Sequence, residues 1–129
     1  VYNHGVMERD FTYIDDLVTA IFKLTECPPT YGESGESRKD FDSLSPVASF
    51  RVVNIGNSNS ESLTNFIQEI ERGLGKSAKR NYLPMQQGDV PATWADTSLL
   101  KDLTGYTPST DLFTGVQKFI RWYQTFYQL

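Results

Sequence analysis

Apolar residues recur at three- and four-residue intervals in four stretches of the chain, a spacing that places them on one face of a helix. The first helix is expected from about Asp16 to Glu26, because the Pro28-Pro29 pair that follows cannot continue it. The second is expected after a turn and cap at 57–60. Its apolar positions are Leu63, Phe66, Ile67, Ile70 and Leu74, with Gly73 and Gly75 at its end.

Two further helices are predicted towards the end of the chain. A short one is capped by Asp96, is closed by Gly105 and carries the leucines Leu99, Leu100 and Leu103. The last helix begins at Thr110 or Asp111, because both residue types cap helix starts well. Its apolar positions form a broad stripe that we expect to be core first and a ligand surface only second: Leu112, Val116, Phe119, Ile120, Tyr123, Phe126 and Tyr127.

Four short stretches have the composition of strands. Val1 to Gly5 is predicted as a strand that enters a turn, and Arg9 to Tyr13 as the strand that returns from it. Phe50 to Ile55 is a continuous apolar run, which suits a strand buried on both faces, as in a parallel sheet. Lys79 to Leu83 is expected to be another short strand.

The stretch 27–49 lacks any helical or strand periodicity. It holds three prolines, two glycines and five serines, with few large apolar residues. A loop of this length is unusual inside a compact domain, so it is either mobile or a functional cover. We predict that residues 1–129 form a single unit in which 27–49 is a flexible loop.

Charge and cysteine content exclude several classes of function. A net charge of −4 and a pI near 4.9 argue against nucleic acid or an anionic membrane as a partner. Cys27 is the single cysteine and His4 the single histidine, so neither an internal disulfide nor a zinc site is expected. His4 lies at a turn tip, away from any nucleophile, and is expected to be a plain surface residue. No apolar run approaches the ~20 residues that span a bilayer, and a reducing cytoplasm suits the chain.

The segment from Arg9 to Asp16 combines a fixed cation with the start of a helix. Arg9 can grip a phosphate through two parallel hydrogen bonds. Phe11 and Tyr13, two residues apart, share one face if the segment is a strand. Asp15 and Asp16 suit the positive end of the helix that follows. From these residues alone, a solvated arginine beside an ordinary strand–helix junction is the favoured interpretation.

Three stretches together resemble one enzyme family. Arg-Asp-Phe-Thr-Tyr-Ile-Asp-Asp at 9–16, Val-Val-Asn-Ile-Gly-Asn-Ser at 52–58 and Pro-Met-Gln-Gln-Gly-Asp-Val-Pro-Ala-Thr at 84–93 occur in order and at similar spacing in extended short-chain dehydrogenase/reductase enzymes that epimerise or dehydrate nucleotide sugars. The similarity is greatest to the UDP-glucuronate 4-epimerase branch. The resemblance implies an α/β fold with few short strands and about four helices, the substrate-binding C-terminal third of a Rossmann-type enzyme.

The resemblance also implies a substrate site. It places Arg9 on the diphosphate of a UDP-sugar, Asp89 on the ribose hydroxyls and Gln86 near the phosphates, with Thr93 close to the nucleotide. Gln86 stands where galactose epimerases have arginine, which favours the glucuronate branch. Gln87 replaces a proline that this branch usually shows. By residue type alone, Asp89 is equally well an ordinary turn residue.

Two motifs for cofactor and catalysis fail the test of context. Gly73-Leu74-Gly75-Lys76-Ser77-Ala78 imitates a dinucleotide fingerprint, but its glycines end a helix, whereas a true fingerprint leaves a strand and opens a helix. No tyrosine is followed four residues later by lysine, so the Tyr-x-x-x-Lys pair of the family is absent. We therefore predict no catalytic, cofactor-binding or metal residue in this chain. NAD would be bound by an N-terminal domain of the intact enzyme, and the isolated chain would be inactive.

The resulting interpretation is the UDP-binding portion of an NAD-dependent UDP-glucuronate 4-epimerase, which interconverts UDP-glucuronate and UDP-galacturonate. A related UDP-sugar 4-epimerase or dehydratase and a non-catalytic binding module are the alternatives. A sheet without its neighbouring strands has open edges, so a homo-oligomer or a domain-swapped dimer is expected as a further partner.

Overall fold

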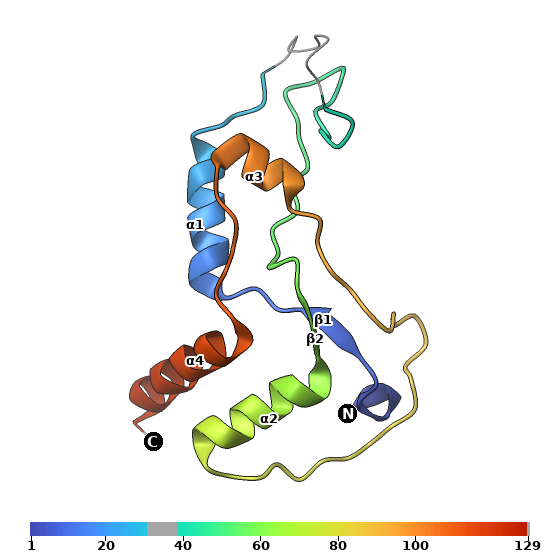
Figure 1. Cartoon of the computed structure of the whole chain (residues 1–129), viewed down its shortest axis with the longest axis vertical. Helices are drawn as coiled ribbons and strands as arrows, with labels where there is room; N and C mark the ends of the chain where they lie inside the picture. Colours follow the sequence, from blue (N-terminus) through green and yellow to red (C-terminus); the bar gives the residue numbers. More distant parts are fainter. Residues whose placement is uncertain (31–38, 129) are drawn as a thin grey trace.

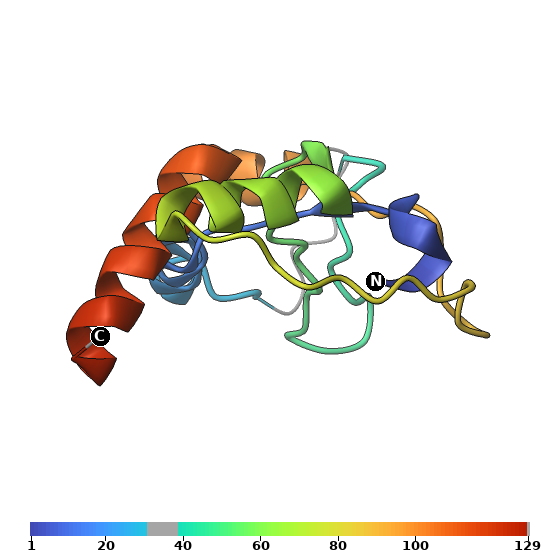
Figure 2. The same ribbon diagram turned by 90° about the horizontal axis from the view of Figure 1, so that it is seen from below.

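The computed structural model describes residues 1–30 and 39–128 (Figure 1). Its elements, in chain order, are η1 (Tyr2–Gly5), β1 (Glu8–Asp10), α1 (Ile14–Thr25), β2 (Ser60–Ser62), α2 (Leu63–Leu74), α3 (Ser98–Thr104) and α4 (Leu112–Tyr127). Helices α2 and α4 pack together at one end of the molecule, while α1 and α3 pack together further along it (Figures 1 and 2). The predicted α/β class, with short strands and four α-helices, is confirmed.

Strand β1 is the centre of the small sheet. It pairs antiparallel with β2, with Arg9 opposite Glu61. On its other side the chain from Pro91 runs parallel to it, because the Glu8 N–H donates to the Pro91 carbonyl at 2.8 Å and the Thr93 N–H donates to the Glu8 carbonyl at 3.3 Å. Three segments that are far apart in sequence therefore meet at β1: β1 itself, β2 and the chain around Ala92.

The strand predictions were only partly right. Val1 to Gly5 is a 3-10 turn, in which Asn3 and His4 have positive φ angles of 47° and 50°. The strand expected from Arg9 to Tyr13 is the shorter β1, after which the chain runs extended into α1. Lys79 to Leu83 has no strand assignment, although Leu83 exchanges backbone hydrogen bonds with Val1 and His4.

Phe50 to Ile55 is likewise not a strand in this structure. A strand that is apolar on both faces needs a neighbour to pair with, and none of the described residues forms a ladder with it. Its backbone is instead bonded locally: the Val52 N–H donates to Ser43 Oγ at 3.0 Å, and the Ser45 N–H donates to the Phe50 carbonyl at 2.8 Å.

The first two helices occur where the periodicity predicts them, with shifted ends. Helix α1 begins at Ile14, so that Asp16 lies in its first turn. The cap of α2 is Ser62, whose Oγ accepts from the Asn65 N–H at 3.0 Å, and not the turn at 57–60. Gly75, with φ of 62°, ends α2, whereas Gly73 lies inside the helix.

The caps of the last two helices were largely predicted. Gly105 closes α3 in the left-handed conformation. Asp96 stands just before α3 and accepts from the Ser98 N–H at 2.9 Å, while the formal cap residue is Thr97. Of the two candidates for α4, Asp111 is the cap, because its Oδ1 accepts from the Thr114 N–H at 2.9 Å.

The apolar stripe of α4 is core only in its first half. Val116 and Ile120 are buried against α2, where Gly73 leaves room for the tip of Ile120. Towards its end α4 runs beyond α2 (Figure 2). The stripe is exposed there, and its aromatic rings contact one another and the neighbouring Trp122 in mostly tilted pairs: Phe119, Tyr123, Phe126 and Tyr127. The prediction that the second half of the stripe is core was therefore wrong. Helix α2, with twelve residues, is too short to cover the end of the sixteen-residue α4.

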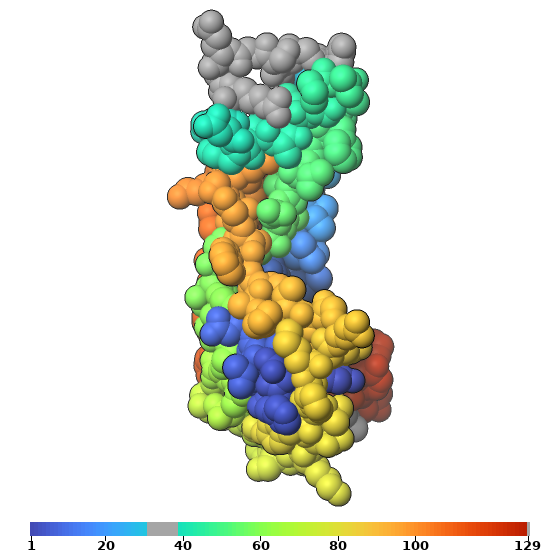
Figure 3. Space-filling model, turned by 90° about the vertical axis from the view of Figure 1, so that its right-hand side faces the viewer, coloured from blue at the N-terminus to red at the C-terminus, as the bar shows by residue number. Residues whose placement is uncertain are grey.

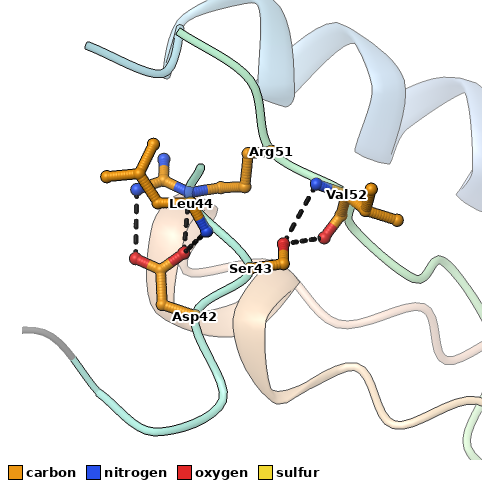
Figure 4. A network of polar contacts seen from close by, with 5 residues as sticks. All are labelled: Asp42, Ser43, Leu44, Arg51 and Val52. Carbon is orange, nitrogen blue, oxygen red and sulfur yellow. Dashed lines mark hydrogen bonds and ion pairs between the residues drawn. The ribbon is translucent and has the colours of Figure 1, made fainter. Parts of the chain in front are cut away.

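Residues 39–52 form a hydrogen-bonded hairpin-like segment at the other end of the molecule. Asp42 accepts two bonds from Arg51, at 2.9 and 3.1 Å, and Ser43 bonds to Val52 (Figure 4). Between these contacts Leu44 is buried. The predicted flexible loop 27–49 includes residues 31–38, which lie outside the described residues, so its flexibility and the single-unit organisation stay predictions.

Asp16 joins the start of α1 to the segment before α4. Its carboxylate accepts from the Tyr106 hydroxyl at 2.8 Å, the Thr110 N–H at 2.8 Å and the Ser109 N–H at 3.2 Å. Partial burial raises the pKa of Asp16, but the hydrogen bonds outweigh burial, and the pKa is lowered below its ordinary value of 3.8. Asp16 therefore stabilises the fold above the pKa of the unfolded chain, and this contribution is lost as the pH falls through the lowered folded-state pKa.

We predict that Asp16→Asn lowers the free energy of unfolding by about 1–3 kcal/mol at pH 7, because one carboxylate oxygen becomes a donor facing other donors. The difference from the unsubstituted chain should shrink as the pH is lowered below about 4. Urea unfolding followed by circular dichroism between pH 3 and pH 7 measures both effects. Asp15→Asn, an exposed change in the same helical turn, is the matched control. An equal loss in both variants would contradict the prediction.

Candidate functional site

Arg9 and Asp89, predicted from distant parts of the chain, lie next to each other. Arg9 Nη2 is 3.6 Å from Asp89 Oδ1, and Arg9 Nη1 donates to the carbonyls of Glu8 at 2.8 Å and Pro91 at 3.3 Å. The two carbonyls fix the direction of the guanidinium. The ion pair is long and its side chains are 27% and 39% exposed, so it stabilises the chain little and leaves both groups open to a ligand.

Asp89 and Gln86 belong to one exposed turn. The Asp89 N–H donates to the Gln86 carbonyl at 3.2 Å, and Gly88 has a φ of 90°, which other residues rarely adopt. The segment that carries this turn lies over the N-terminal residues in Figure 3. It is held there at both ends, by the backbone bonds of Leu83 and of Pro91.

Thr93 faces a different space from the Arg9–Asp89 pair. It lines a hollow of about 270 Å³ together with Asp10, Thr12, Asn54, Ile55, Gly56, Trp94 and Ala95. Arg9 and Asp89 are not among these residues, in keeping with the alternation of side chains along β1. Of the four predicted site residues, the structure thus brings Arg9 and Asp89 into contact, keeps Gln86 in the same turn, and sets Thr93 beside Asp10.

Asp10 is a structural centre that the sequence analysis missed. Its carboxylate accepts three backbone N–H bonds, from Asn57 at 2.9 Å, Ser58 at 2.9 Å and Ala95 at 3.0 Å. Gly56 leaves room for it, since a Cβ there would stand 2.7 Å from Asp10 Oδ2 and 2.5 Å from the Ala95 Cβ. The only sequence signal was a small, polar Gly-Asn-Ser turn that directly follows an apolar run.

Comparison with known proteins gives a consistent result, although no protein-family model matches the chain. The chain is 45% identical over 128 residues to a probable UDP-glucuronate 4-epimerase of Rhizobium meliloti, covering 99% of this chain and 38% of that protein. It is 40% identical over 127 residues to UDP-glucuronate 4-epimerase 4 of Arabidopsis thaliana, covering 97% of this chain and 28% of that protein.

A solved structure agrees with these relatives. The UDP-glucuronic acid 4-epimerase from Bacillus cereus, in complex with UDP-glucuronic acid and NAD, superposes with a TM-score of 0.72 at 28% identity, covering 98% of this chain and 35% of that one. Over nearly its whole length the chain is similar to nucleotide-sugar epimerases of the short-chain dehydrogenase/reductase type. It corresponds to the C-terminal part of such enzymes and spans 38% or less of the length of the relatives named above.

The glycines that imitate a dinucleotide fingerprint lie at the end of a helix and not before one. Gly73 lies within α2 and Gly75 ends that helix, so no helix N-terminus follows these glycines to receive a pyrophosphate. Within residues 1–30 and 39–128, no cluster of three or more His, Cys, Asp or Glu side chains is placed to hold a metal ion. None of the helices described has the length and apolar character needed to cross a bilayer.

A second hollow, of about 330 Å³, is almost purely apolar and lies between the start of α1, α2 and α4. Phe11 and Tyr13 both line it, but so do Thr12 and Ile14, which were expected on the other face, because the chain beyond Asp10 is not a strand. The ring of Phe11 stacks on Phe66 with centroids 4.4 Å apart. Such walls offer little to a charged ligand, so the Arg9–Asp89 pair remains the candidate polar site.

We predict that Gly56→Ala lowers the free energy of unfolding by about 1–3 kcal/mol, because the new methyl group would collide with Asp10 and Ala95. The double variant Gly56→Ala/Ala95→Gly should recover part of this loss, since it removes the nearer of the two collisions. Urea unfolding of the two variants and of Ala95→Gly alone measures the coupling. If the losses of the two single variants simply add up in the double variant, the packing between Gly56, Asp10 and Ala95 is not tight.

Proposed function

We propose that this chain is the UDP-recognising portion of an NAD-dependent UDP-glucuronate 4-epimerase, with Arg9 on the diphosphate and Asp89 on the ribose hydroxyls. The observation that carries the proposal is the 3.6 Å contact between Arg9 and Asp89, residues eighty positions apart in sequence. Gln86, in the turn of Asp89, would lie near the phosphates. Thr93 would contact the nucleotide sugar from the neighbouring hollow.

The electrostatics of the pair support this assignment. A carboxylate beside a diphosphate site would repel the ligand unless a cation lay between them. Arg9 meets this need, because two backbone carbonyls hold its guanidinium while Nη2 faces Asp89. Charge-assisted hydrogen bonds from a guanidinium that is already held in place to a phosphate are among the stronger polar contacts in proteins. The net charge of −4 does not oppose binding, since contacts at short range outweigh it.

In the intact epimerase, NAD and the catalytic base would come from a part of the enzyme outside this chain. The chain has no Tyr-x-x-x-Lys pair and no dinucleotide fingerprint in the required context, so it would contribute binding and no chemical step. UDP then serves as the handle of the substrate, and its binding energy holds a sugar that must be free to turn. We place the enzyme in carbohydrate metabolism in the cytoplasm.

We predict that the chain binds UDP weakly and that Arg9→Ala raises the Kd for UDP at least about tenfold, since it removes charge-assisted bonds worth roughly 1.5–3 kcal/mol. Binding of uridine, which lacks phosphates, should be insensitive to Arg9→Ala but weakened by Asp89→Asn. Isothermal titration calorimetry with both ligands measures these values. Arg121→Ala, an exposed change on α4, is the control. Equal losses in Arg9→Ala and Arg121→Ala would refute the site.

For an enzyme in which this chain is joined to an NAD-binding part, we predict conversion of UDP-glucuronate to UDP-galacturonate, and no turnover by the chain alone. Chromatographic separation of the two UDP-sugars measures the reaction. Turnover of UDP-glucose instead would indicate a galactose-type epimerase. An encoding gene that lacks Gly-x-x-Gly-x-x-Gly and Tyr-x-x-x-Lys upstream of Val1 would indicate a non-catalytic binding module.

A further inference from the structure

We propose that Asp10 is the positioning residue of the substrate site, because its carboxylate holds the segment that carries Asp89 in register with Arg9. Asp10 lines the hollow beside Thr93, and the hydrogen bonds of its carboxylate go to residues other than the Arg9–Asp89 pair. It acts through Ala95, whose N–H it binds at 3.0 Å, and through the turn at 56–58. The inference rests on the proposed function in one respect only, the assignment of the Arg9–Asp89 pair as the UDP site.

The first step of the argument is the way in which the segment 91–95 follows β1. The backbone of Glu8 binds both Pro91 and Thr93, which is the pattern of a parallel ladder. In such a ladder the next bond from residue 95 would go to the backbone of residue 10. Here the Ala95 N–H donates to the side chain of Asp10 instead, so this carboxylate takes the place of the backbone acceptor.

The second step concerns what holds the Asp10 carboxylate still. Two of its three bonds come from Asn57 and Ser58, in the turn that leads into β2. Ser58 has a φ of 54°, and its hydroxyl bonds to the Ala95 carbonyl at 2.9 Å and to Thr97 at 2.8 Å. The Asp10 carboxylate thus binds the N–H of Ala95, while the Ser58 hydroxyl binds its carbonyl.

The third step is the consequence for Asp89. Residues 84–90 are exposed throughout, and Asp89 lies two residues before the anchor at Pro91. Without the bond at Ala95, the segment would keep the two backbone bonds of Glu8 and the longer bond from Arg9 Nη1 to the Pro91 carbonyl, all of them at or before Thr93. A slip of one residue along a strand moves the chain by about 3.3 Å. Such a shift is nearly as large as the 3.6 Å separation of Arg9 and Asp89, and it would part them.

The test compares Asp10→Asn with the control Asp15→Asn by amide NMR, at a temperature at which circular dichroism shows both variants folded. In Asp10→Asn we expect the Ala95 amide to exchange at least about tenfold faster and the Gly88 and Asp89 signals to move. We also expect the Kd for UDP to rise about tenfold, an effect that a merely structural role would not produce in the folded fraction. Unmoved Gly88 and Asp89 signals would overturn the inference.

A second measurement needs no substitution and covers the case in which Asp10→Asn does not fold. Because linkage is reciprocal, saturating UDP should slow amide exchange at Ala95 in the unsubstituted chain, while the Gly105 amide, at the end of α3, stays unchanged. Unaltered exchange at Ala95 with UDP bound would refute the positioning role. Failure of the unsubstituted chain to bind UDP would refute the proposed site, and the Gly88 and Asp89 signals of Asp10→Asn would then decide the role of Asp10 alone.

Discussion

The binding of backbone N–H groups by aspartate side chains is the interaction on which the tertiary arrangement depends. Asp10 joins β1 to residues 57, 58 and 95, and Asp16 joins α1 to residues 106–110. Strands of three residues form few ladder bonds of their own. Carboxylates can accept several bonds at once, and ionised acceptors make stronger hydrogen bonds than neutral ones. They therefore hold together segments that the small sheet alone would not.

This dependence explains which parts of the fold were predictable. Helices follow from local information, and the periodicity, Asp111, Gly75 and Gly105 located the α-helices to within about two residues. A strand depends on its partners. The run from Phe50 to Ile55 has the composition of a buried strand, but no described segment pairs with it. The prediction of a strand there was wrong, because the pairing that makes a strand is not a local property.

The same limit applies to the candidate site. Arg9 was a candidate from its chemistry, but only family resemblance connected it with Asp89, since nothing in either stretch indicates that they meet. Asp16 was interpreted as a cap for its own helix, whereas it binds residues more than ninety positions away. Asp10 received no role, because an acceptor for backbone groups is recognisable only once the donors are placed around it. Sequence chemistry identified the charged groups and could not identify their partners.

The exposed apolar surface follows from the same reasoning. Helix α1 buries Ala20 against α3, yet its opposite side presents Ile14, Val18, Ile21 and Phe22, each at least half exposed. Phe50 and Val52 are also more than half exposed, although their pattern predicts burial on both faces. Patches of this kind mark surfaces that contact other protein. Helix α1 thus carries apolar residues both on the side that packs against α3 and on a side that none of the described helices covers, while Asp15 and Lys23 keep the helix from being apolar all round.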